Sequence, residues 1–158
     1  MTFQQWHIPQ HVIDQTAHAF ACGRYEVFVL WTAALDTSGD VCHVVRCIVP
    51  DQQAGITPDG VFVHIEGSEL SRIQFDNFDR GERSVVQLHT HPGIDVRMSN
   101  LDRQWEVVAH DGALSIIVPS YGDLGLLGFP GVHVYERQGG QWRLWPRDEV
   151  LGRLKVSA

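Results

Sequence analysis

The feature that most constrains the fold is an almost wholly apolar run over residues 25–35 (YEVFVLWTAAL). Its β-branched and aromatic side chains favour a strand, and a strand without polar alternation is typically covered on both faces of its sheet. Further strands are predicted at 41–49, 61–65, 84–89, 113–118, 132–135 and 141–144, and helices at 9–22, 69–78, 99–109 and 147–155. Since the two kinds of element are interspersed, we expect an α/β or α+β fold, with a mixed central β-sheet flanked by helices.

The size and charge of the chain limit its partners. Its 158 residues suit a single domain over 1–158. Asp and Glu number 19 against 12 Lys and Arg, a net charge of −7 that argues against nucleic-acid binding. No apolar run approaches the roughly 20 residues that span a bilayer, and the N-terminus lacks the pattern of a signal peptide. We therefore expect a cytoplasmic protein that binds neither nucleic acid nor membrane.

The three cysteines, Cys22, Cys42 and Cys47, point to the same compartment. Their number is odd, each lies in or beside an apolar run, and none forms a CxxC pair. We expect small buried thiols in a reducing environment, not a disulfide or a cysteine-based zinc site.

Two histidines and a carboxylate recur at close spacing in the stretch HTHPGIDVRMSNLD, residues 89–102. Residues two apart on a strand share a face, so His89 and His91 at the end of a strand can direct both imidazoles to one point. The proline that follows ends the strand, and the loop allows Asp102, in the first turn of the next helix, to face them. Two histidines and one carboxylate, with a fourth position for water, are the ligands of a catalytic zinc site.

Each part of this pattern also has a structural interpretation. Ser99 and Asp102 are spaced as in a helix capping box, although Glu or Gln is the usual third residue. A histidine pair on a strand is more often a surface feature than a metal site. The combination HxHP, six residues, SxxD is specific, because four chemically relevant residue types must coincide in order.

This combination resembles the JAMM motif of the MPN/JAB metalloprotease family in its active form. The resemblance covers most of the chain, including the upstream helix, the apolar strand and the segment ALSIIVPSYG. It implies a mixed sheet between helices, the MPN/JAB fold, which is similar to that of cytidine deaminases. It also implies one zinc ion, with His89, His91 and Asp102 as ligands, and Ser99 as the hydrogen-bond donor to the oxyanion of the reaction.

The family also requires an upstream glutamate, and Glu26 occupies that place in this chain. A carboxylate at the head of so apolar a strand is costly to bury without a partner, whereas at a solvated strand end it has no special role. The resemblance implies that Glu26 takes a proton from water and passes it to the leaving amine. Phe28 and Val29 stand where many members carry a glycine.

The substrate also follows only from the resemblance. Members are zinc-dependent isopeptidases and peptidases, and the chain is similar to compact bacterial, deubiquitinase-like ones. This implies cleavage after the C-terminal tail of a ubiquitin-like protein or its conjugates, for processing or deconjugation, with E1/E2-like conjugation proteins as further partners. Two alternatives stay open: a zinc peptidase acting on a small carrier-protein adduct, and a non-catalytic MPN scaffold, which the intact motif disfavours. The PCxxC signature of nucleobase deaminases is absent from the sequence.

Overall fold

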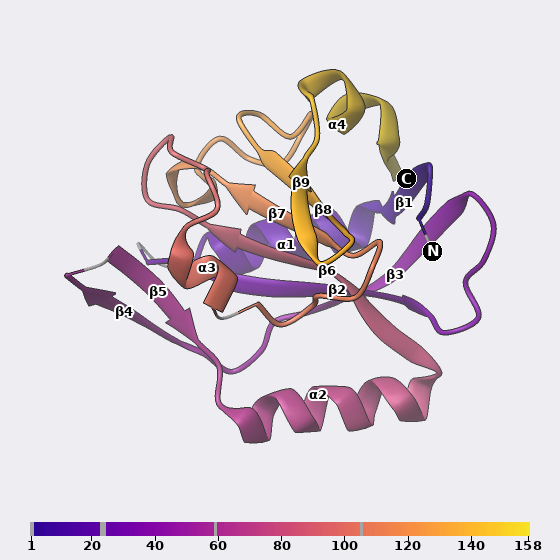
Figure 1. The fold of residues 1–158 in the computed structure, drawn as a ribbon, viewed down its shortest axis with the longest axis horizontal. Coiled ribbons are helices and arrows are strands. Elements are labelled where there is room, and N and C mark those ends of the chain that lie inside the picture. Colours follow the sequence, from indigo (N-terminus) through magenta and orange to yellow (C-terminus); the bar gives the residue numbers. More distant parts are fainter. Residues whose placement is uncertain (1, 23–24, 59, 105) are drawn as a thin grey trace.

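A mixed eight-stranded sheet, described by a computed structural model, forms the centre of the protein (Figure 1). The structure describes residues 2–158 except 23–24, 59 and 105. The strands of this sheet, in spatial order, are β10 (Leu154–Ser157), β1 (Gln5–Pro9), β3 (Val41–Ile48), β2 (Phe28–Ala34), β6 (Glu82–Thr90), β7 (Leu114–Val118), β8 (His133–Gln138) and β9 (Gln141–Leu144). Neighbours are parallel at β10–β1, β1–β3 and β6–β7 and antiparallel elsewhere.

A separate hairpin and the helices surround this sheet. The hairpin pairs β4 (Gln53–Thr57) with β5 (Gly60–His64). The helices are α1 (Gln10–Phe20), α2 (Gly67–Arg80), α3 (Asn100–Gln104), α4 (Arg147–Arg153) and the 3-10 helix η1 (Ser120–Gly122). The predicted fold class, a mixed sheet flanked by helices, is confirmed.

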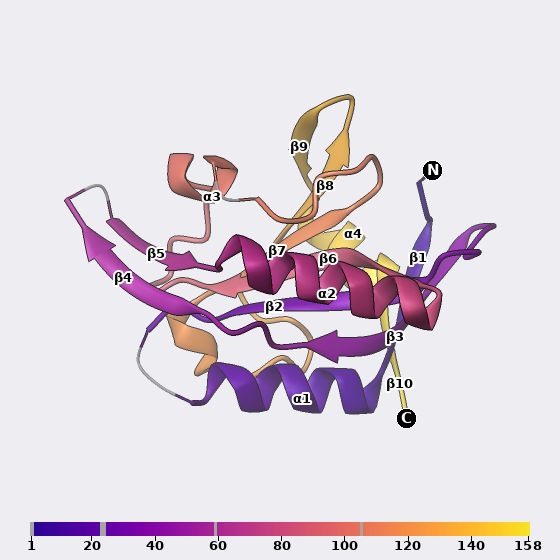
Figure 2. The same cartoon turned by 90° about the horizontal axis from the view of Figure 1, so that it is seen from below.

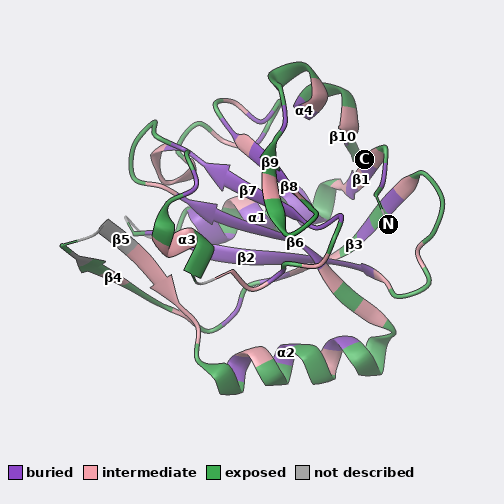
Figure 3. Ribbon diagram, viewed as in Figure 1, coloured by how far each residue is buried: buried purple, intermediate pink, exposed green. Residues whose placement is uncertain are grey.

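The two faces of the sheet carry different layers. Figures 1 and 2 show α1 behind the sheet, while α3 lies in front of it and α2 runs along the lower side. Strand β2 packs against other elements on both faces of the sheet. Val29 and Trp31 belong to the core cluster that includes residues of α1, whereas Leu30 packs in the cluster that includes Ile73 of α2. This explains the unbroken apolar run and the burial of the central strands in Figure 3. Burial of each such apolar side chain contributes roughly 1.5–3 kcal/mol to the stability of the fold.

The predicted helix over 99–109 is wrong in its second half. Helix α3 ends at Gln104, and residues 106–109 have no regular secondary structure. Val107 and Val108 donate their backbone N–H groups to the side chain of Gln87 instead of to the preceding turn of a helix. A contact from the central sheet therefore overrides the local helical pattern.

Three strands were not predicted: β1, β4 and β10. Strand β10 occupies the end of the segment predicted as a helix over 147–155, because the helix ends at Arg153 and the chain then pairs in parallel with β1. Parallel pairing between the two ends of the chain depends on contacts far apart in sequence, so no local pattern indicates it.

The burial of the cysteines agrees in part with the prediction from the sequence. The cysteines are free; Cys42 is buried and Cys47 is partly buried. Cys22 is exposed, so the prediction of a buried side chain is wrong there, since it lies just beyond the end of α1. Among the described residues, no helix is both long enough and apolar enough to cross a bilayer. The cytoplasmic location stays a prediction.

Candidate metal centre

Strand β6 places the first two residues of the centre. His89 lies between Phe28 of β2 and Ile117 of β7, and its ring is stacked at 6.3 Å from the Phe28 ring. The strand ends at Thr90, but the backbone N–H of His91 still donates to the Val118 carbonyl at 2.8 Å. Both imidazoles are therefore held at the end of a strand that is paired on both sides.

Helix α3 places Asp102. The Ser99 N–H donates to Asp102 Oδ2 at 2.8 Å, and the Asp102 N–H donates to Ser99 Oγ at 3.0 Å. This reciprocal pair is a capping box with aspartate as its third residue, as the spacing predicted. The box fixes the Asp102 side chain in the first turn of α3.

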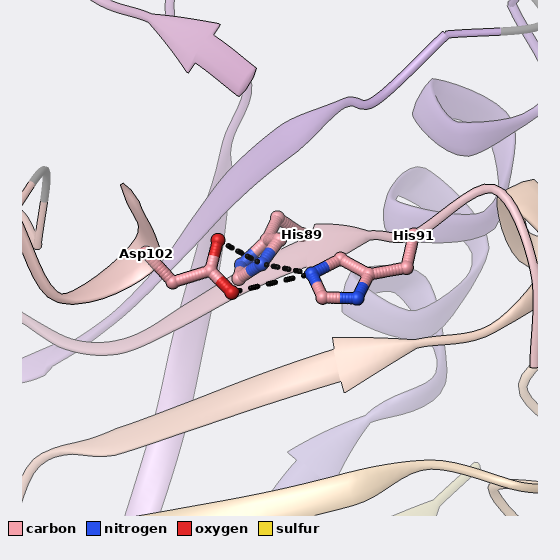
Figure 4. A group of neighbouring side chains, drawn as sticks. All are labelled: His89, His91 and Asp102. Carbon is pink, nitrogen blue, oxygen red and sulfur yellow. Dashed lines mark hydrogen bonds and ion pairs between the residues drawn. The ribbon is translucent and has the colours of Figure 1, made fainter. Parts of the chain in front are cut away.

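The structure brings the three predicted ligands together at one point (Figure 4). The Nε2 atoms of His89 and His91 are 3.0 Å apart. Asp102 Oδ1 lies 3.1 Å from His89 Nε2, and Asp102 Oδ2 lies 3.3 Å from His91 Nε2. One ligand atom from each residue lies within 4.8 Å of the others, so the group could hold a metal ion.

The donor atoms of this group suit a divalent cation. His91 Nδ1 lies 2.8 Å from the Asp95 carbonyl oxygen, which can only accept a hydrogen bond. The proton of a neutral His91 is therefore on Nδ1, and Nε2 directs its lone pair toward the other two residues. Hydrogen bonding of the remote ring nitrogen to a carbonyl is typical of histidines that bind metals. The residues present fit a zinc ion with two nitrogen ligands and one oxygen ligand.

Electrostatics in the group favour the ionised carboxylate. Burial alone would raise the pKa of Asp102, but hydrogen bonds with His89 and His91 outweigh it and hold the pKa well below its usual range. For His91, burial alone would lower the pKa, but contacts with Asp102 and the Asp95 carbonyl raise it above the usual 6.5. The carboxylate is thus ready to bind a cation, and protons compete with it for the His91 imidazole.

Glu26 lies beside this group. The sequence predicted a strand that begins at Tyr25 and includes Glu26. Strand β2 begins at Phe28, so Glu26 lies two residues before it. Its neighbour Val27 exchanges two hydrogen bonds with Thr90: the Val27 N–H donates to Thr90 Oγ1 at 3.0 Å, and the Thr90 N–H donates to the Val27 carbonyl at 3.1 Å. These bonds tie Glu26 to the end of β6, next to His89.

Glu26 is 5% exposed and lines a narrow slot together with His89 and Asp102. Burial raises the pKa of Glu26, an effect that His89 and His91 oppose. The other walls of the slot come from four elements, β2, β5, β6 and α3, with Phe28, Phe62, Val63, Gln87 and Leu101 as lining residues. A raised pKa in a small slot is what a residue that accepts and returns protons requires.

Sequence reasoning missed two supporting groups of the centre. The Asp95 contribution comes from its backbone, so no side chain indicates it. Gln87 did carry a signal, because it is a polar residue inside the apolar run VVQLH, and it is 2% exposed. The Asp95 carbonyl contacts His91, and Gln87 contacts the segment after α3; both contacts depend on the fold.

Comparisons with known proteins agree with this geometry. No protein-family model matches the chain. A JAB1/MPN domain protein from Archaeoglobus fulgidus superposes with a TM-score of 0.50 at 16% identity, covering 98% of both chains. A protein from Desulfitobacterium hafniense, determined in solution, superposes with a TM-score of 0.60 at 13% identity, covering 97% of this chain and 93% of that one. The fold is therefore that of a JAB1/MPN domain.

A curated relative carries the comparison beyond the fold. A probable metalloprotease from Sinorhizobium fredii is 30% identical over 107 residues, which are 66% of this chain and 64% of the relative. The chain thus spans less than two thirds of the length of that protein. With the JAB1/MPN fold and the His-His-Asp group, this relative confirms the resemblance to the JAMM/MPN family.

Proposed function

We propose that the protein is a zinc-dependent peptidase that cleaves after the C-terminal tail of a ubiquitin-like protein. The observation that carries the proposal is the convergence of His89, His91 and Asp102, with the His91 tautomer fixed by the Asp95 carbonyl. The name of the Sinorhizobium relative supports metalloprotease chemistry.

In this proposal His89, His91 and Asp102 hold the zinc ion. When bound, zinc supplies Lewis acidity and lowers the pKa of a bound water to about 7. Glu26 lies in the same slot as His89 and Asp102, where its carboxylate takes the proton from the attacking water and delivers it to the leaving amine.

Ser99 stabilises the developing oxyanion in this scheme. Its Oγ already accepts the Asp102 N–H, so its position is fixed by the capping box. A hydroxyl that accepts one hydrogen bond can still donate its own hydrogen. Such a preorganised donor contributes roughly 2.7–4 kcal/mol to stabilisation of the transition state.

The size and the neighbours of the slot support the proposal of a slender, extended substrate. The slot is small, about 30 Å³, so a substrate tail that enters it must lack bulky side chains. Phe62 and Val63 of the hairpin line it, and in the described part of the chain β4 and β5 pair only with each other. A free strand edge beside the slot can add an extended peptide as a further strand.

Glu26→Gln tests the roles of metal and base separately. We expect this variant to bind zinc as the wild type does and to lose at least about a hundredfold in hydrolysis, because general acid–base catalysis contributes roughly 10²–10⁴. Zinc content and the rate of cleavage are measured on the same preparations. Full activity of the variant would show that Glu26 does not take part in the reaction.

The substrate is tested with ubiquitin-like proteins fused through their C-terminal tails to a reporter. We expect cleavage at the junction that stops when a chelator removes the metal and returns with added zinc. Absence of chelator-sensitive cleavage of every such fusion, by a protein that binds zinc, would contradict the ubiquitin-like substrate.

A further inference from the structure

We infer that Gln87 is a positioning residue for the metal ligand Asp102, an inference that rests on the proposed metal site. Gln87 lies on β6 two residues before His89, and its side chain lines the same slot as His89 and Asp102. Its oxygen binds not the ligands themselves but the backbone of the segment that follows α3.

Both polar atoms of the Gln87 amide form hydrogen bonds. Its Oε1 accepts the backbone N–H groups of Val107 and Val108, both at 2.9 Å. Its Nε2 donates to the hydroxyl of Ser115, a buried residue paired with it on β7, at 3.2 Å. Two N–H donors meet one amide atom, so that atom is the oxygen and the orientation of the amide is determined.

These bonds replace a missing turn of helix. In a helix continued past Gln104, the N–H groups of Val107 and Val108 would donate to the carbonyls four residues earlier, those of Arg103 and Gln104. They donate to Gln87 instead, and α3 has only five residues. A helix this short is not stable by itself, so its position depends on how its two ends are attached.

Both attachments come from the central sheet. Ahead of α3, the Met98 N–H donates to the hydroxyl of Tyr135 on β8 at 3.1 Å. After α3, Gln87 holds the backbone of Val107 and Val108, while Arg137 of β8 and Trp142 of β9 donate to the Glu106 carboxylate. Because Gln87 and His89 share one strand and one face, β6 positions the imidazoles directly and, through the Gln87 amide, contributes to the position of the Asp102 carboxylate.

The test compares zinc affinity in matched variants of the whole protein, by competition with a chromophoric chelator. Gln87→Met keeps the length of the side chain but removes the acceptor, and we expect zinc to bind about ten- to hundredfold more weakly, the usual effect of losing a partner that orients a ligand. Gln87→Glu keeps an acceptor and should recover most of that loss. Ser115→Ala removes the other contact of the amide and should leave zinc affinity within about twofold of wild type.

A merely structural role would give a different pattern. In that case Gln87→Met would lower the melting temperature of the metal-free protein as Ser115→Ala does, with zinc affinity unchanged in both, and the inference would be overturned. Equal losses of affinity in Gln87→Met and Gln87→Glu would also overturn it.

A second measurement needs no metal. The Arg103 N–H, which donates to the Ser99 carbonyl inside α3, should exchange with solvent faster in metal-free Gln87→Met than in Ser115→Ala. Unchanged exchange would contradict the positioning role. If the wild type fails to bind zinc, the proposed function is wrong, whereas the exchange comparison still decides whether Gln87 positions α3.

Discussion

At the scale of single residues, one hydrogen bond decides what the centre can bind. The bond between His91 Nδ1 and the Asp95 carbonyl leaves Nε2 as an electron-pair donor toward Asp102 and His89. Without it the imidazole could adopt the other tautomer and present a proton to the centre. A carbonyl thus selects the state of a ring that a metal requires.

This chemistry predicts how zinc affinity depends on pH. Although burial lowers the pKa of His91, its contacts with Asp102 and Asp95 raise it above 6.5 in the metal-free protein. Protons then compete with the metal. As the pH is lowered, zinc affinity should therefore start to decrease while the pH is still above 6.5, and it should decrease further at lower pH. Chelator competition between pH 8 and pH 5.5 measures this, and an affinity that stays level down to pH 6 would contradict it.

At the scale of elements, α3 and the hairpin both bring side chains to the slot beside β6. The capping box joins Ser99 and Asp102, so the N-terminal end of α3 carries both a proposed metal ligand and the proposed oxyanion donor. Phe62 of β5 and Leu101 of α3 are both walls of the slot. Neither element is part of the large sheet, and each depends on its attachments for position.

The two roles of Ser99 can be separated by substitution. Ser99→Ala removes the cap acceptor and the hydroxyl donor, so we expect about 1 kcal/mol lower stability together with roughly 10²–10³ lower kcat. Glycine is tolerated at a helix N-cap at a cost of only a few tenths of a kcal/mol, so Ser99→Gly should lose the same activity with little loss of stability. Denaturant unfolding and kcat of both variants check this; a fully active Ser99→Gly would exclude the hydroxyl from the reaction.

Gly55 of β4 offers a test of the hairpin. A Cβ at this position would overlap the ring of Phe62 on the paired strand, so Gly55→Ala must displace a wall of the slot. We expect a several-fold rise in KM with zinc content unchanged, since no metal ligand moves. Steady-state kinetics and metal analysis measure the two effects, and an unchanged KM would show that Phe62 does not meet the substrate.

The sequence predicts those parts of the site that are local. His89 and His91 share a strand, and Ser99 and Asp102 share a helical turn, so spacing alone indicates how each pair is arranged. The end of α3 at Gln104 could not be predicted, because it depends on Gln87 from another element. The strands β1 and β10 are likewise stabilised by pairing between the two ends of the chain.

At the scale of the whole molecule, stability and chemistry lie on opposite faces of one sheet. The α1 face is a large apolar core in which Thr16 is a buried polar residue: its hydroxyl donates to the Val12 carbonyl at 2.7 Å and accepts from Trp31 Nε1 at 2.8 Å. The face with α2 and α3 carries the buried polar residues of the site, Glu26, Gln87 and His89.

Substitution on the α1 face should therefore change stability alone. Thr16→Val keeps the shape of the side chain but leaves Trp31 Nε1 buried without its acceptor, so we expect a loss of about 1–3 kcal/mol in the free energy of unfolding. Zinc affinity should remain that of the wild type. A change in zinc affinity comparable to the change in stability would mean that the two faces are not independent.

The most direct test of the account is a crystal structure of the zinc-loaded protein with anomalous diffraction at the zinc edge. We expect a single strong peak about 2.0–2.2 Å from His89 Nε2, His91 Nε2 and an Asp102 carboxylate oxygen, with a water as the fourth ligand. A peak elsewhere, or a fourth ligand supplied by the protein, would contradict the assignment of a catalytic metal centre.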